Sequence, residues 1–303
     1  MKKKIVLMLT VIMLIGLAGC GKNQINIKET GTSDNNEQMV QNIYENKRTE
    51  VKQKISEIKE RLPETSAEDK GTCGSKAKWY YKDNTLIIYG EGVITEDTWH
   101  KSNIVINTVV IDSGITKLGN NMFSGLGSEV GKNIENFYIA DGLEEIGSST
   151  FVNCDCLSEI VLPPSLYFID GYTFASCDSL KNVYMTDGVE KIGDSAFTGC
   201  KSLDSIFIPK TVLAIGNGVF TGCNNLSDIQ ISKDNRIFSE KNNCIINNDT
   251  KTLIYAINKD FSIPDDILCI AEDAIYGCEI DSLVIPEGCL LYTSPSPRDP
   301  KTS

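Results

Sequence analysis

A repeat of 23 residues constrains the fold of this chain more than any other feature. Phenylalanine recurs at that spacing four times, and each copy carries isoleucine five residues before it, cysteine three residues after it and leucine six residues after it. Self-similarity at such a period is typical of solenoids, in which stacked units bury a core that one unit cannot form alone. The positions are Phe151, Phe174, Phe197 and Phe220; Ile146, Ile169, Ile192 and Ile215; Cys154, Cys177, Cys200 and Cys223; and Leu157, Leu180, Leu203 and Leu226.

Each unit divides into a strand and a corner. Its L-x-x-I-x-I run predicts a short strand with inward Leu and Ile side chains, and its I-G-x-x-A-F-x-x-C run predicts a turn that packs the aromatic ring on the preceding unit. The in-register cysteines then form a stack of small buried side chains. We expect most of them to be free and unreactive, with disulfides between neighbouring units as the alternative.

Two copies depart from this period. The copy around Phe123 has five extra residues between Ser124 and Glu135, and an insert at about 233–262 delays the last copy. The insert contains Asn242 to Ile246 and Thr252 to Tyr255, two runs typical of short strands, so it predicts a β-hairpin on the flank of the solenoid.

The pattern resembles the BspA-like leucine-rich repeat family of bacterial surface proteins. The clearest copy runs from Val189 through Ile192-Gly193, Ala196-Phe197 and Cys200 to Ile206-Phe207-Ile208-Pro209, and the resemblance covers roughly residues 70–288. It implies a β-rich leucine-rich-repeat-like solenoid over 107–288 and a β-rich N-terminal cap over 70–106. Members of this family include surface proteins that bind host extracellular-matrix proteins or other bacteria.

The N-terminal residues 1–20 predict a lipoprotein signal peptide. Three lysines, Lys2 to Lys4, precede the apolar stretch Ile5 to Leu17, which is too short to span a membrane comfortably. The sequence Leu17-Ala18-Gly19-Cys20 resembles the bacterial lipobox, which implies that Cys20 is lipidated and anchors the chain on the extracellular face of the membrane. An ordinary signal peptide or a short anchor helix is the alternative.

The segments that flank the repeats have other compositions. Residues 21–38 are polar and predict a flexible tether. Residues 39–63 predict a helical stalk that ends at Pro63, although the polar run Glu45 to Glu50 interrupts its apolar stripe. Residues 289–303 show no repeat feature and look like a non-native tail, with a genuine disordered tail as the alternative. The stripe consists of Val40, Ile43, Val51, Ile55, Ile58 and Leu62.

Charge and composition exclude several functions. With 29 basic and 41 acidic residues the net charge is −12, and removal of the three signal-peptide lysines makes it 26 − 41 = −15, which disfavours a nucleic-acid partner. The single histidine, His100, has no partner in a catalytic motif, and Cys154-Asp155-Cys156 fits the repeat. The polar runs Ser232 to Asn235 and Asn247 to Asp249 are more typical of turns than of calcium loops. We therefore expect no catalytic residue, metal or cofactor.

The candidate binding surface is the outer side of the predicted strands. The middle residue of each I-x-I run faces outward, which gives a partly aromatic row beside a polar one. An aromatic patch with a polar rim suits an extracellular protein partner, and hence interaction or adhesion at the cell surface. The row could instead only stabilise the stack. A carbohydrate-binding or cell-wall scaffold protein is the alternative function, and a catalytic domain beyond this chain is a third. The outward row is Tyr138, Val161, Tyr184, Phe207 and Gln230.

Overall fold

The computed structural model describes residues 33–102, 104–126, 129–257, 261–278 and 282–291. The helix α1 (Ser33–Arg61) and a short 3-10 turn, η1 (Glu64–Ser66), precede a β-rich cap. The cap consists of β1 (Asp69–Thr72), β2 (Lys76–Lys82), β3 (Thr85–Ile94) and the 3-10 turn η2 (Thr98–Ser102). Strands β1, β2 and β3 pair in antiparallel order, so the cap predicted over 70–106 is β-rich.

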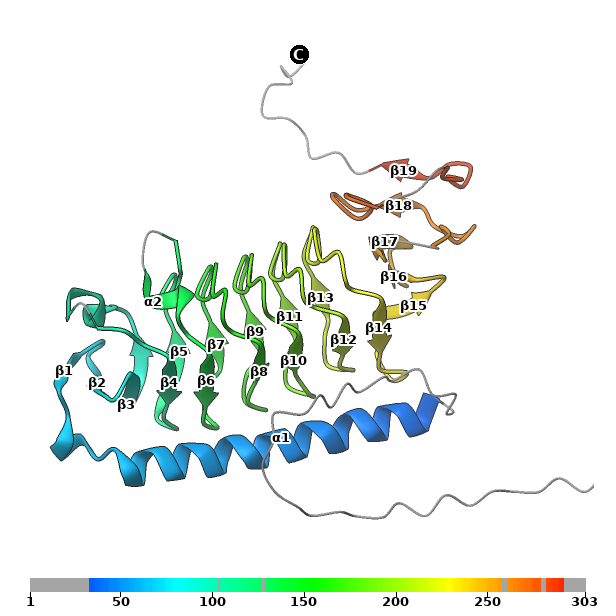
Figure 1. Cartoon of the computed structure of the whole chain (residues 1–303). Coiled ribbons are helices and arrows are strands. Elements are labelled where there is room, and N and C mark those ends of the chain that lie inside the picture. The colour runs from blue at the N-terminus through cyan, green and yellow to red at the C-terminus, as the bar shows by residue number, and fades with distance from the viewer. Residues whose placement is uncertain (1–32, 103, 127–128, 258–260, 279–281, 292–303) are drawn as a thin grey trace, which may run out of the picture.

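Two strand ladders run the length of the solenoid (Figure 1). Ladder A contains the L-x-x-I-x-I runs, namely β4 (Thr108–Ile111), β6 (Asn136–Ile139), β8 (Glu159–Val161), β10 (Asn182–Tyr184), β12 (Ser205–Ile208) and β14 (Asp228–Ile231). Ladder B contains the runs around the I-G motif, namely β5 (Ile115–Leu118), β7 (Glu145–Ile146), β9 (Phe168–Ile169), β11 (Lys191–Ile192) and β13 (Ala214–Ile215). Pairing within both ladders is parallel, which confirms the predicted solenoid.

The repeated phenylalanines form a buried stack between the ladders. Adjacent rings lie nearly parallel, with centroid distances of 5.1 Å between Phe151 and Phe174 and 5.3 Å between Phe174 and Phe197. Trp99 of the cap stacks on Phe123 at one end, and Tyr255 meets Phe220 edge-on at the other. Aromatic contacts of this kind add about 0.5–1.5 kcal/mol each to area burial, so the stack joins successive units into one core.

The repeated cysteines are free, and each contacts the preceding unit through its thiol. The Sγ of Cys177 donates to the carbonyl oxygen of Phe151 at 2.9 Å, and that of Cys200 donates to Phe174 at 3.1 Å. Burial raises the pKa of Cys177 above its ordinary value, which keeps the thiol protonated and able to donate. All ten cysteines in the described residues are unpaired, as expected from their spacing.

Steric crowding explains why glycine follows isoleucine in the I-G motif. A Cβ on Gly193 would lie 2.5 Å from the backbone nitrogen of Gly171, and one on Gly216 would lie 2.4 Å from that of Asp194. The backbones of successive units therefore approach too closely at this corner for a side chain.

The irregular copies differ in part from expectation. The extra residues after Ser124 include a short helix, α2 (Glu129–Lys132). The insert predicted as a flanking hairpin forms three antiparallel strands, β15 (Phe238–Lys241), β16 (Cys244–Asn247) and β17 (Thr252–Ala256). Strand β17 then pairs in parallel with β18 (Cys269–Ile270), which pairs with β19 (Leu290–Leu291). The insert continues the stack of the solenoid, because its last strand, β17, pairs in parallel with β18 as a repeat strand would.

The predicted terminal segments fall only partly within the described residues. The predicted signal peptide, Cys20 and residues 21–32 of the predicted tether lie outside the described residues, as do residues 292–303 of the predicted tail. Residues 33–38 of that tether are helical. Val284 of the last repeat copy is 83% exposed. Leu290 of the predicted tail is 71% exposed, and contrary to the expectation of no repeat feature there, Leu290–Leu291 pairs in parallel with β18.

Candidate functional site

Helix α1 lies along ladder A rather than projecting from the solenoid (Figure 1). Near its first turns, Ser232 after β14 donates a hydrogen bond to Glu37 at 2.5 Å, and Thr186 after β10 donates to Gln41 at 2.9 Å. At its other end the hydroxyl of Tyr80 in β2 donates to the carbonyl oxygen of Leu62 at 2.9 Å. The predicted helix is therefore confirmed, and it packs along the solenoid.

An apolar seam joins α1 to ladder A. The buried helix residues follow a spacing of seven, four, three and four, which places them on one face of the helix. They pack on outward-facing side chains of the cap and of ladder A, including Ile87, Val110 and Val161. Full burial of a side chain of this size contributes roughly 1.5–3 kcal/mol, so the seam is a substantial interface. The helix residues are Tyr44, Val51, Ile55, Ile58 and Leu62.

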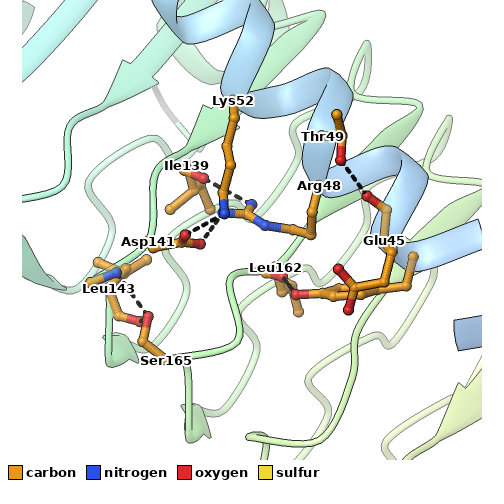
Figure 2. Close-up of polar contacts among 11 residues, drawn as sticks. Glu45, Arg48, Thr49, Lys52, Ile139, Asp141, Leu143, Leu162 and Ser165 are labelled. Atoms are coloured by element: carbon orange, nitrogen blue, oxygen red, sulfur yellow. Dashed lines mark hydrogen bonds and ion pairs between the residues drawn. The ribbon is translucent and has the colours of Figure 1, made fainter. Parts of the chain in front are cut away.

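Arg48 lies inside this seam, one turn after Tyr44, and is 3% exposed. Its Nη1 donates to the carbonyl oxygen of Ile139 at 2.9 Å, and its Nη2 donates to the carboxylate of Asp141 at 2.5 Å (Figure 2). The buried Nε of Arg48 has no hydrogen-bond partner within the described part of the chain. A buried guanidinium is expensive to desolvate, so the two acceptors on ladder A are needed to hold it there.

Further ion pairs flank the seam, with Asp112 and Asp141 after the ends of β4 and β6 and Glu159 at the start of β8. Lys52 lies 2.7 Å from Asp141, Lys47 lies 3.1 Å from Glu159, and Lys59 lies 2.5 Å from Asp112. Burial by itself would raise the pKa of Asp141, but hydrogen bonds from Lys52 and Arg48 outweigh it and lower that pKa below its ordinary value. The carboxylates beside ladder A are thus matched by cations of α1.

The predicted row of partner-binding residues lies on this surface. Val161 is buried, and Tyr138 and Tyr184 are partly buried against the same cluster as the α1 seam. Phe207 and Gln230 continue the row and are also partly buried. The outward direction of these side chains agrees with the sequence, and Tyr138, Val161 and Tyr184 pack in the same cluster as α1. Whether the row binds a partner stays a prediction.

Three residues of this surface, Tyr44, Arg48 and Asp141, are not among those predicted from the sequence. The hydroxyl of Tyr44 donates to the carbonyl oxygen of Leu162 at 2.8 Å, and burial raises the pKa of that phenol. The signal was present, because Tyr44 and Arg48 continue the spacing of Val51 and Ile55 by whole helical turns. The apolar pattern was hard to recognise because a charged residue, Arg48, occupies one of its positions.

A pocket of about 380 Å³ remains between the C-terminal half of α1 and ladder A. It combines an aromatic ring with hydroxyl, cationic and carboxylate groups, a set that can bind a polar ligand. Its lining residues are Lys54, Glu57, Ile58, Arg61, Thr85, Thr108 and Tyr138.

The other candidate residues fall outside this surface. His100 is hydrogen-bonded through Nδ1 to Asp97 in the cap. Within the described ranges, no three His, Cys, Asp or Glu side chains are grouped so that they could hold a metal ion. No helix of those ranges is both long enough and apolar enough to cross a membrane.

Comparisons with known proteins agree with this architecture. The sequence model described as the BspA type leucine rich repeat region matches residues 129–250 in six copies. No curated protein sequence matches the chain. Solved structures with the same fold include a leucine-rich repeat protein from Eubacterium ventriosum, with a TM-score of 0.65 and 21% identity over 74% of this chain and 61% of that one.

Two further structures extend the comparison. The pneumococcal vaccine antigen PcpA has a TM-score of 0.55 and 16% identity, covering 74% of this chain and 66% of that one. A leucine rich cell surface protein from Faecalibacterium prausnitzii has a TM-score of 0.52 and 21% identity, covering 75% of this chain and 73% of that one. The chain thus spans less than two thirds of the lengths of the first two structures. Residues 129–250 of the chain are thus a region of BspA-type leucine-rich repeats.

Proposed function

We propose that this chain is a cell-surface protein that binds an extracellular protein partner through ladder A, and that it serves interaction or adhesion rather than catalysis. The observation that carries the proposal is the burial of an amphipathic helix on the outward row of that ladder. A surface that packs one helix through apolar side chains and charged rims has the chemistry of a protein-binding face. The pneumococcal antigen and the Faecalibacterium cell surface protein, which share the fold, support a location outside the cell.

Binding to a surface coated with solubilised extracellular matrix tests this function. We expect the variant Tyr138→Ser/Tyr184→Ser/Phe207→Ser to bind about tenfold less protein than the wild type, because it removes the aromatic part of the row. The matched control replaces three exposed tyrosines elsewhere, in Tyr167→Ser/Tyr172→Ser/Tyr276→Ser. Unchanged binding by the first variant, with its circular dichroism spectrum intact, would show that ladder A is not the binding face.

We also propose that Cys20 carries a lipid that holds the chain at the membrane. The motif Leu17-Ala18-Gly19-Cys20 supports this assignment. Growth of expressing bacteria with an alkyne-tagged fatty acid should label the wild type and the control Cys156→Ser, while Cys20→Ser should lose the label and leave the membrane fraction. Label retained on Cys20→Ser would refute the anchor.

Carbohydrate binding is the second candidate, and the pocket beside Tyr138 favours it. An aromatic ring together with Thr85, Thr108 and Glu57 offers both stacking and hydrogen bonds to a sugar. A glycan array separates the candidates. Signals that disappear in Thr108→Val, together with no binding to the matrix-coated surface, would favour a glycan ligand.

A further inference from the structure

We propose that the partner recognised by ladder A is a basic amphipathic helix, and that α1 is a resident ligand that such a helix replaces. This inference rests on the proposed function, since it names the kind of partner that the same surface takes. It follows from the chemistry of the surface beneath α1, from the way α1 is held and from the imperfect fit at Arg48.

The surface beneath α1 selects for cations at defined places. Asp112, Asp141 and Glu159 lie beside the apolar row, and each makes its ion pair with a lysine or arginine of α1. Without α1 these carboxylates would border a strip of exposed apolar side chains that includes Val110 and Val161. A helix with apolar residues on one face and Lys or Arg on its border fits this surface, whereas an acidic helix would be repelled.

Helix α1 packs on the outer side of ladder A in the way that a separate helical ligand would. The strands of ladder A pair as β4 with β6, β8 with β10 and β12 with β14, β4 also pairs with β3 of the cap, and α1 adds no strand to any of these pairs. Its seam packs on the outward side of the sheet, while the phenylalanine stack and the cysteines lie on the inner side. Removal of α1 therefore exposes a binding face without opening the core.

The fit of α1 is incomplete at its centre. Arg48 is desolvated, yet its buried Nε has no acceptor in the described structure. An unmade hydrogen bond on a buried charged group lowers the net stability of the docked helix. A partner helix that satisfies Ile139 and Asp141 without this loss can compete, even though tethering gives α1 an effective concentration on the order of millimolar.

A labelled peptide of residues 33–62, added to the full-length chain, tests the inference. The chain carrying Lys47→Glu/Lys52→Glu/Lys59→Glu/Ile55→Asp has a weakened α1 of its own and an intact ladder A. We expect fluorescence anisotropy to show about tenfold tighter peptide binding to this chain than to the wild type, because the tethered competitor is lost. A peptide with the three lysine reversals should not bind. The control chain Lys76→Glu/Lys201→Glu/Lys251→Glu should behave like the wild type, because these lysines pair away from α1.

Hydrogen exchange on the same chains decides the outcome. Rapid exchange of the α1 amides in the weakened chain, together with failure to bind the wild-type peptide, would overturn the inference, as would an α1 that stays protected despite the four substitutions. Concentration-dependent dimerisation of wild-type chains through exchanged α1 helices supports it, because the second copy then supplies the basic helix. A separate result would contradict the proposed function. In that case the matrix-coated surface would bind the wild-type and weakened chains no better than an uncoated surface, independently of the result with the peptide.

Discussion

The guanidinium of Arg48 and the carboxylate of Asp141 join α1 to the turn after β6, at an Nη2 to Oδ1 distance of 2.5 Å. The two partners differ in environment, since the side chain of Arg48 is 3% exposed and that of Asp141 is 44% exposed. Loss of either residue breaks the same ion pair, but only one of the two losses leaves a buried charge behind. The pair therefore predicts unequal effects of substitution.

The first prediction compares Asp141→Ala with Arg48→Met. Asp141→Ala strands a buried cation and should lower the free energy of α1 docking by about 2 kcal/mol, less than for a fully buried pair because Asp141 is half exposed. Arg48→Met removes the charge, keeps an apolar stem in the seam and should change the docking free energy by less than about 1 kcal/mol. Hydrogen exchange of the α1 amides measures both. Equal losses in the two variants would contradict this account of the pair.

The second prediction concerns pH. Because the pKa of Asp141 is lowered in the folded chain, its ion pairs stabilise α1 above the ordinary aspartate pKa of about 3.9, and this stability is lost as the pH falls through the lowered value. Protection of the α1 amides should be constant from about pH 5 to pH 8 and should decrease below about pH 4. Asp141→Asn should make the protection lower and reduce its pH dependence. An unchanged profile in that variant would assign the acid sensitivity to other carboxylates.

The third prediction concerns the cysteines. In the native protein Cys156 is exposed, whereas Cys154, Cys177, Cys200 and Cys223 are buried. An aqueous thiol reagent should modify Cys156 first and reach the buried thiols only after unfolding, since the reactive thiolate is disfavoured by burial. Mass spectrometry of the modified peptides measures the order. A disulfide-linked pair of repeat peptides from unreduced protein would contradict the free-thiol arrangement.

The fourth prediction concerns the aromatic stack. Phe174 is fully buried between Phe151 and Phe197, so Phe174→Ala should lower the free energy of unfolding by about 3–5 kcal/mol through loss of apolar contact and creation of a cavity. The control Phe168→Ala removes a partly exposed ring of ladder B and should have a smaller effect. Denaturant unfolding followed by circular dichroism compares the two. Similar midpoints for both variants would show that the stack does not determine stability.

The sequence predicted most of the solenoid because its information is periodic. The spacing of Phe151, Phe174 and Phe197 placed those rings in one register, and parallel stacking is the arrangement that buries all of them. The insert was harder to predict, since two short apolar runs such as Cys244–Asn247 and Thr252–Ala256 do not reveal that Phe238–Lys241 adds a third strand. Their partners are set by contacts distant in sequence.

What the sequence determined by itself was the repeat, the outward row that includes Tyr138 and Tyr184, and an amphipathic helix before the cap. Only the tertiary structure decided that the helix packs on Tyr138, Val161 and Tyr184 of this row. An apolar stripe states that a helix must bury one face, but it does not name the surface that does so. The position of Arg48 in the apolar stripe is explained by the tertiary structure, in which Ile139 and Asp141 accept its hydrogen bonds. A buried charge is tolerated only where the fold supplies such acceptors.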